Sequence, residues 1–240
     1  YTGISTEHLN VRNNVGIFDV SHMGEFYVSG NDALEFLNYV CSNNIHKIKI
    51  YKAQYNCLIN ENGGIIDDLI IYRTNEKDYM LVVNAANIEK DWNWLNQQIK
   101  KFNCKISNKS DSIGLISVQG PNSLKLINDV FNDNFESIKK FNFKSIIIKN
   151  SKVLISNTGY TGSVGYELYV DNKIIIDVWR SLYSKKVKYS LCAVGLGARD
   201  TLRIEAGYPL YGNEINALTS PHEATLMWIT DLNKNFIGNN

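Results

Sequence analysis

The stretch AQYNCLINENGGIIDDLIIYR, residues 53–73, predicts a β-hairpin that carries two adjacent carboxylates in its second arm. The Asn-Gly-Gly sequence at 62–64 supplies residues that tolerate the positive φ of a tight turn, and both flanking runs are rich in apolar residues. Successive side chains of a strand point to opposite faces of a sheet, so Asp67 and Asp68 should face different ways. At least one of them should therefore meet surroundings that resist an ionised group.

Strict alternation divides the second arm of the hairpin into two faces. We expect every side chain of this arm to follow the period of two. One face is expected to carry Ile66, Asp68, Ile70 and Tyr72, and the other Ile65, Asp67, Leu69 and Ile71.

Outward from the hairpin, the apolar spacing predicts short strands and amphipathic helices. One helix has Leu34, Leu37 and Val40 on one side, with Asn31 or Asp32 as its N-cap. The strand–helix–strand–strand–helix order of the first half is typical of split βαβ folds, so we expect an α+β protein with antiparallel sheets and flanking helices. Further strands are expected at 15–20, 24–30, 79–85, 114–120, 143–150, 151–162 and 165–171, and further helices at 87–102, 122–131, 173–184 and within 191–207.

Composition excludes several classes of protein. The 240 residues are 44% hydrophobic and 20% charged, which is enough apolar content for a globular core. The net charge of +1 and the lack of a basic stretch with interleaved aromatic residues give no reason to expect nucleic acid as a partner. Apolar runs such as 146–148 are far shorter than the about 20 residues of a membrane span. Four scattered cysteines indicate neither a zinc site nor a disulfide framework and suit a reducing compartment.

Three features remain as functional candidates on residue type alone. The aspartate pair is either an active-site acid or base, or one solvated and one hydrogen-bonded carboxylate. Glu167 lies opposite Tyr166 and Leu168 by alternation, where a solvated glutamate is the default. Arg199 and Arg203 lie one helical turn apart, and solvated or ion-paired arginines are the default there. Residue types alone leave these alternatives open.

Two other motifs do not support a site. The glycines of TGYTGSVGYE, residues 158–167, match neither the dinucleotide fingerprint nor the P-loop, so they predict a turn between strands. The four histidines have no ligand spacing, so the sequence gives no support for a metal site.

Seven ordered blocks across essentially the whole chain resemble one family, the aminomethyltransferases (T-proteins) of the glycine cleavage system. No single block is specific enough, but seven in the same order do not match by chance. The blocks are VGIFDVSHMGEF, NENGGIIDDLIIYR, LVVNAANIEKDWNWL, VQGP, NTGYTG with GYEL, GLGARDTLRIEAGYPLYGNEI and TSPHEA.

The resemblance implies a three-domain, cloverleaf-like layout around a central folate channel. On that pattern residues 24–110 form a ferredoxin-like domain, inserted into a folate-binding domain built from residues 1–23 and 111–216. Residues 217–240 would only begin a C-terminal β-barrel, which this chain mostly lacks. Because the chain opens on a tyrosine instead of Met and stops at NKNFIGNN, we expect it to be a fragment of a longer protein.

The resemblance also implies an activity. Family members take an aminomethyl group carried on the lipoyl arm of the H-protein and pass the one-carbon unit to tetrahydrofolate. Ammonia is released and methylenetetrahydrofolate forms. The expected acceptor is therefore tetrahydrofolate and the expected partner is lipoylated H-protein, with no metal, nucleic acid or membrane. Bacterial members are cytoplasmic and eukaryotic ones mitochondrial. The residues of the seven blocks resemble bacterial members more, so we expect a cytoplasmic protein.

Site residues follow from the same motif matches. Asp68 takes the position of the family's key carboxylate beside the reactive nitrogens of folate and is the expected catalytic residue, whereas Asp67 is expected to be structural. A carboxylate can grip the amide-and-amine edge of a pterin with paired hydrogen bonds, and aromatic side chains can flank its ring. The expected folate-binding set is Tyr55, Asp68, Asn84, Tyr160, Glu167 and Arg199.

Rival functions share the fold or the ligand. Folate domains of sarcosine or dimethylglycine dehydrogenases and sulfonium-compound demethylases also use tetrahydrofolate, with other donors. A non-catalytic folate-binding relative that serves iron–sulfur proteins typically carries K-G-C-Y-x-G-Q-E, which NTGYTGSVGYE at 157–167 does not resemble. The lysines Lys185, Lys186 and Lys188 are either a solvated helix end or a docking surface for the generally acidic H-protein.

Overall fold

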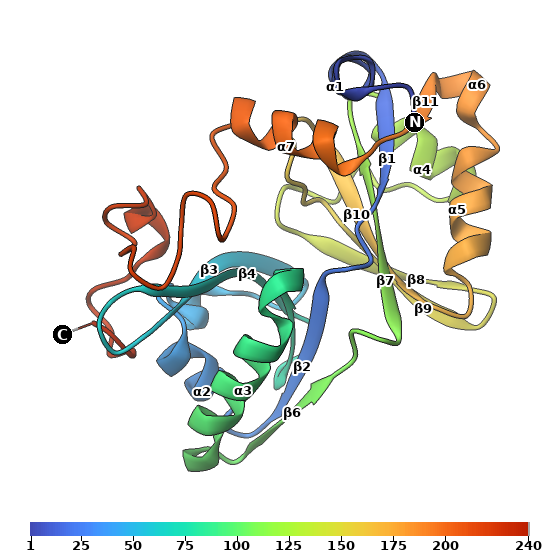
Figure 1. Cartoon of the computed structure of the whole chain (residues 1–240). Helices are drawn as coiled ribbons and strands as arrows, with labels where there is room; N and C mark the ends of the chain where they lie inside the picture. The colour runs from blue at the N-terminus through green and yellow to red at the C-terminus, as the bar shows by residue number, and fades with distance from the viewer. Residues whose placement is uncertain (240) are drawn as a thin grey trace. The chain divides into compact units, whose positions relative to one another are not determined.

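The computed structural model describes residues 1–239, which fold into two compact units (Figure 1). Unit 1 contains residues 1–22 and 111–208, and unit 2 contains residues 23–110 and 209–240, of which residue 240 lies outside the described part. Residues 209–216, expected in the enclosing domain, belong to unit 2. The expectation that residues 217–240 begin a further domain stays a prediction.

Unit 1 is built on a six-stranded sheet with the strand order β11-β1-β7-β10-β9-β8. Its neighbouring strands are antiparallel except β1 and β11, which run parallel. The sheet is therefore mixed, whereas antiparallel sheets were expected. A parallel partner becomes possible because a helical crossover precedes β11. The strands are β1 (Val15–Asp19), β7 (Ile113–Gln119), β8 (Phe143–Ile148), β9 (Ser151–Ser156), β10 (Gly165–Asp171) and β11 (Leu191–Ala193).

Helices α4 (Ser123–Phe131) and α5 (Ile175–Tyr183) of unit 1 pack on its sheet. Their apolar sides join the inward-facing residues of the strands in one buried core. Elsewhere in the unit, α1 (Ile4–Asn13) lies beside α7 (Leu196–Glu205), and the short α6 (Lys186–Tyr189) leads into β11. The α1–α7 pair matters for the site, since α7 carries Arg199.

Unit 2 is built on a five-stranded antiparallel sheet with the order β3-β4-β5-β2-β6. Without β3, its chain order of β2, α2, β4, β5, α3 and β6 is that of a ferredoxin-like fold. The strands are β2 (Gly24–Gly30), β3 (Lys52–Ile59), β4 (Ile65–Arg73), β5 (Asp78–Val83) and β6 (Cys104–Asn108), and the helices are α2 (Ala33–Val40) and α3 (Ile88–Gln98).

The two faces of this sheet have different covers. Helices α2 and α3 pack on one face, in a core that includes Phe26, Leu37 and Leu95 (Figure 1). On the other face, residues from the 209–239 segment, such as Ile229, pack against β3 and β4. Short 3₁₀ turns occur at Ile45–Lys47, Ala85–Asn87, Ile99–Lys101 and Met227–Ile229.

A β-bulge interrupts the pairing of β3 with β4 beside the aspartate pair. The register shifts between Leu58 and Ile59, where Ile59 pairs with Ile65 and Ile66 becomes the extra residue. Ile65 therefore lies on the face of Asp68, and Ile66 lies in the core under the helices. The strict alternation was wrong for these two isoleucines, because the extra residue shifts their faces by one position.

The N-cap of α2 is Asp32, one of the two expected residues, but it does not cap the helix with its side chain. Its Oδ2 instead accepts a hydrogen bond from the backbone N–H of Asn103 at 2.7 Å, which ties the start of α2 to the segment before β6. No helix within residues 1–239 is long and apolar enough to cross a membrane.

Candidate active site

Two side chains from neighbouring strands hold the carboxylate of Asp68. Tyr55 on β3 donates its hydroxyl to Oδ2 at 2.7 Å, and Asn84, directly after β5, donates its side-chain amide to Oδ1 at 2.8 Å. The three residues meet because β4 lies between β3 and β5 in the sheet. Both oxygens of Asp68 are therefore fixed in direction, while the residue keeps some exposure to solvent.

Asp68 titrates far above an ordinary aspartate. Burial and then the charge of Asp67 raise the pKa of Asp68 to about 7, against the opposing hydrogen bonds from Tyr55 and Asn84. A carboxyl group with a pKa near neutrality can hold or release a proton at physiological pH. This is the property of a general acid or base.

Asp67 is fully buried and accepts three hydrogen bonds. The backbone N–H of Asn84 donates to Oδ2 at 3.0 Å, and the side-chain amides of Asn84 and Asn87 donate to Oδ1 at 2.9 and 2.5 Å. Three donors stabilise a buried anion. Since the Asn84 amide nitrogen donates to Asp68 as well, this one side chain bridges the two carboxylates.

A third carboxylate, that of Asp91 on α3, is buried next to Asp67. No hydrogen-bond donor among residues 1–239 reaches either of its oxygens. Burial, with Asp67 beside it, raises the pKa of Asp91 to about 10. Asp91 was not among the predicted site residues, although its position was a signal: it lies three residues after Ile88 and four before Leu95, on the apolar side of the helix.

In unit 1, the buried Glu167 and the partly buried Arg199 belong to a second polar region. Glu167 is 6% exposed, and its Oε2 accepts a hydrogen bond from the hydroxyl of Thr158 at 2.6 Å. The guanidinium of Arg199 lies over the ring of Tyr160, 4.7 Å from its centre, and that ring stacks on Tyr208 at 5.9 Å. A solvated glutamate, the default expectation, is therefore not what the structure has.

The charges of this group influence each other. Burial raises the pKa of Glu167, while the hydrogen bond from Thr158 and the positive charge of Arg199 oppose that change. Burial likewise lowers the pKa of Arg199, and the Glu167 charge opposes it. Nη1 of Arg199 is buried without a hydrogen-bond partner among the residues described. A buried guanidinium N–H without a partner is costly, and an acceptor from a ligand would satisfy it.

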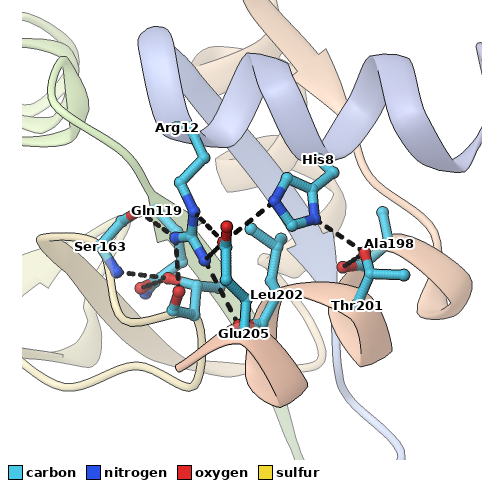
Figure 2. A network of polar contacts seen from close by, with 9 residues as sticks. His8, Arg12, Gln119, Ser163, Ala198, Thr201, Leu202 and Glu205 are labelled. Carbon is cyan, nitrogen blue, oxygen red and sulfur yellow. Dashed lines mark hydrogen bonds and ion pairs between the residues drawn. The ribbon is translucent and has the colours of Figure 1, made fainter. Parts of the chain in front are cut away.

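The loop that carries Tyr160 is held by Arg12 of α1 (Figure 2). Arg12 donates to the backbone oxygen of Thr161 at 2.5 Å and to the hydroxyl of Ser163 at 2.6 Å. Its Nε donates at 2.7 Å to Glu205 near the end of α7, which also contacts His8. Figure 2 shows these side chains converging between α1, α7 and the loop. Arg12 was not among the predicted site residues, because no motif or apolar pattern around it indicates a role.

Two glycines of the same loop leave room for Gln119. A Cβ atom at Gly159 or Gly165 would come within 2.1 or 2.3 Å of the Gln119 side chain. Gln119 in turn accepts a hydrogen bond from the hydroxyl of Thr161 at 3.0 Å and donates to the carbonyl of Thr158 at 3.2 Å. The glycines thus serve the packing of a turn between strands.

The six predicted site residues fall into two groups, and each group comes together within one unit. Their roles toward folate stay predictions. Tyr55, Asp68 and Asn84 form the group in unit 2, and Tyr160, Glu167 and Arg199 form the group in unit 1.

Two other expectations concern metals and the lysine cluster. No group of three or more His, Cys, Asp or Glu side chains that could hold a metal ion occurs among residues 1–239. Lys185 and Lys188 both contact Asp129, at 3.3 and 2.9 Å, so the positive charge of the cluster is partly neutralised. Its role in docking stays a prediction.

Comparison with known proteins gives a consistent family. The family described as GCVT N-terminal domain matches residues 1–234. The aminomethyltransferase of Thermotoga sp. is 43% identical over 238 residues, which cover 99% of this chain and 65% of that protein. That of Phocaeicola vulgatus is 46% identical over 239 residues, covering 98% of this chain and 66% of that protein. The chain thus spans about two thirds of the length of these curated relatives.

Solved structures agree with the sequence matches. The glycine cleavage system aminomethyltransferase T from Bartonella henselae superposes with a TM-score of 0.91 at 32% identity, covering 99% of this chain and 64% of that one. A heterotetrameric sarcosine oxidase from Corynebacterium shares the fold alone, with a TM-score of 0.54 at 10% identity over 80% of this chain and 95% of that one. The chain belongs to the aminomethyltransferase family of the glycine cleavage system.

Proposed function

We propose that the protein containing this chain transfers the one-carbon unit of aminomethyl-dihydrolipoyl H-protein to tetrahydrofolate, with release of ammonia and formation of methylenetetrahydrofolate. Family membership supports the reaction class. The observation that carries the assignment of the catalytic residue is Asp68, a carboxyl group fixed on both oxygens and with its pKa raised to about 7. Its matches in type and position to the family motif support the same role.

Asp68 has two tasks in this proposal. Ionised, it accepts hydrogen bonds from the amines of a pterin and stabilises positive charge while the carbon unit moves, an effect that grows where water is excluded. With its pKa near neutrality, it can also accept a proton from an amine and return it. Tetrahydrofolate, when bound, supplies the nucleophilic amine. Tyr55 and Asn84 keep the carboxylate directed, so that it needs no reorientation during the reaction.

In unit 1, Arg199, Glu167 and Tyr160 are proposed as further folate contacts. The unsatisfied Nη1 of Arg199 suits a ligand oxygen, and a carboxylate of the folate tail has this chemistry. Glu167 is proposed to accept from polar hydrogens of the ligand, and the ring of Tyr160 offers an aromatic surface. The matched relatives are bacterial, which favours a cytoplasmic enzyme with lipoylated H-protein as its partner.

The test is ammonia release from aminomethylated H-protein by the complete gene product, with and without tetrahydrofolate. We expect release that depends on tetrahydrofolate, with methylenetetrahydrofolate as the product. H-protein that lacks the lipoyl group is the control and should give none. Release of formaldehyde equivalents from sarcosine, dimethylglycine or a sulfonium compound in place of this activity would assign the protein to a rival function.

A further inference from the structure

The carboxyl group of Asp91 cannot be an ordinary anion where it lies. Its side chain is fully buried, and neither oxygen receives a hydrogen bond from any donor in residues 1–239. An ionised carboxylate without donors or a counter-ion is very unfavourable in such a place, whereas the protonated form is a neutral group with one O–H to donate.

Asp67 is the available acceptor for that O–H. It lies next to Asp91, and it already accepts hydrogen bonds from three donors. Oδ1 of Asp67 takes the two side-chain amides, while Oδ2 takes only the backbone N–H of Asn84 and so retains a lone pair. The environments of the two residues differ in one respect: Asp67 has donors and Asp91 has none. The proton of the pair therefore belongs to Asp91.

The pair is linked to Asp68 through one amide. Asn84 donates to Asp67 at 2.9 Å and to Asp68 at 2.8 Å from the same nitrogen. The same nitrogen also donates to the backbone oxygen of Asp68 at 3.1 Å. If Asp67 turned away, Asn84 would lose one of the three acceptors that fix its direction, and its hydrogen bond to the Asp68 carboxylate would be less well directed. A proton on Asp91 thus gives Asp67 a further donor that keeps it in place, and this keeps Asn84 directed at Asp68.

We propose that Asp91 is a positioning residue, which remains protonated at neutral pH, donates to Asp67 and through Asn84 fixes the orientation of Asp68. The part that concerns Asp68 rests on the proposed function, while the protonation of Asp91 does not. The charged groups that act on Asp91 are Asp67 and Asp68 on β4 and Lys90 on its own helix. Lys90 lies over the ring of Tyr211, 3.8 Å from its centre.

Infrared spectroscopy of the complete gene product with carboxyl-labelled aspartate tests the proton directly. At about pH 8.5 an Asp68 with a pKa of about 7 is mostly ionised, and an Asp91 with a pKa of about 10 is mostly protonated. We expect one carbonyl band of a protonated aspartate in the wild type and its loss in Asp91→Asn. No band in the wild type, or a band that persists in Asp91→Asn, would overturn the proposal.

Folding stability gives a second readout that needs no activity. A carboxyl protonated in the folded state and ionised in the unfolded state binds one more proton when folded, so its contribution falls as pH rises. Relative to Asp91→Asn, the wild type should lose about tenfold in its folding constant per pH unit between about pH 5 and pH 9. Glu89→Gln, at an exposed site on α3, is the matched control and should show no such slope. A flat difference for Asp91→Asn would contradict the protonated form.

The positioning role has its own test in turnover. Asp91→Leu fills the space but removes the donor, so kcat should fall about tenfold, with a smaller change in the KM for tetrahydrofolate. Asp91→Asn keeps a hydrogen-bond donor without charge, so its kcat should equal that of the wild type. The apparent pKa on the acid side of its kcat–pH profile should also be unchanged. If Asp91→Leu has the kcat of the wild type, or if Asp91→Asn lowers the apparent pKa on the acid side of the profile, the positioning role is wrong. A wild type without activity would count against the proposed function instead, and the infrared result would still stand.

Discussion

The two units both bury carboxylates, but each stabilises them differently. In unit 2, Asp67 and Asp68 are surrounded by amide and hydroxyl donors, and the negative charges raise one another's energy. In unit 1, Glu167 lies near a guanidinium whose positive charge opposes the effect of burial. Asp68, held by neutral donors beside another carboxylate, has its pKa raised to about 7, which suits proton transfer. The nearby guanidinium stabilises the charge of Glu167, which suits binding.

The largest expected effect separates the two aspartates of unit 2. Asp68→Asn keeps the shape of the side chain and removes its charge, so turnover should fall about a hundredfold or more, as for the loss of an acid–base or electrostatic group. Folate binding should fall less, because the amide still donates and accepts. Turnover per folded, folate-saturated molecule is the measurement.

Asp67→Asn is the matched control for that experiment. Its amide would place a donor against the donors around Asp67, so the main loss should appear in stability. Turnover of the folded fraction should fall about tenfold at most, through Asn84, and so much less than in Asp68→Asn. If turnover per folded molecule falls strongly in Asp67→Asn and hardly changes in Asp68→Asn, the assignment of the two faces is wrong.

The second prediction tests the binding role of unit 1. Glu167→Gln and Arg199→Ala should each weaken tetrahydrofolate binding roughly tenfold or more, because a charge-assisted hydrogen bond contributes about 1.5–3 kcal/mol. The melting temperature should change little. Calorimetric titration of the complete gene product gives the affinity, with the exposed Glu136→Gln as control. Unchanged affinity in both variants would remove them from the folate contacts.

A third, smaller effect concerns the support of the Tyr160 loop. Arg12→Met keeps most of the side-chain volume but removes the hydrogen bonds to Thr161 and Ser163, so the free energy of unfolding should fall by roughly 1.5–3 kcal/mol. Denaturant unfolding measures it, with Arg180→Met at an exposed position of α5 as the control. Equal stability of the two variants would show that the Arg12 network does not hold the loop.

The smallest effect is expected at the lysines near α6. If they steer the acidic H-protein, replacing Lys185, Lys186 and Lys188 by Gln should lower the association rate modestly, since Asp129 already offsets part of their charge. The salt dependence of the rate should flatten while folate affinity is unchanged. If the association rate depends on salt equally in the wild type and the variant, the lysines do not steer docking.

The sequence predicted the fold better than it predicted the environment of each side chain. Strands such as 24–30 and 165–171 were found because their apolar content is periodic and turn residues flank them. Helix α1 was not, because its buried residues are Glu7 and Val11, and a single buried apolar residue gives no hydrophobic period. Strand β6 is at most half-buried and equally lacks a pattern.

For the candidate site, motif resemblance named six residues, and the structure shows which of them lie together. The pairing of Tyr55 with Asp68 across two strands depends on register, which local sequence does not set. The role of Asp91 depends on Asp67 of β4, which precedes it by more than 20 residues in the chain. Charge on a helix is usually solvated, so an aspartate on the apolar side was easy to overlook.

The bulge beside Ile59 has a consequence for how this hairpin can change over evolution or in the laboratory. Because the extra residue lies between the turn and the aspartates, the register at Asp68 is set by β3 and β5 downstream of it. Loop length at 60–64 can therefore vary without exchanging the two acids between faces. A single-residue deletion that removes Ile66 should be absorbed by straightening the strand. A deletion after Asp68 has no such buffer and would carry a hydrophobic residue to the wrong side.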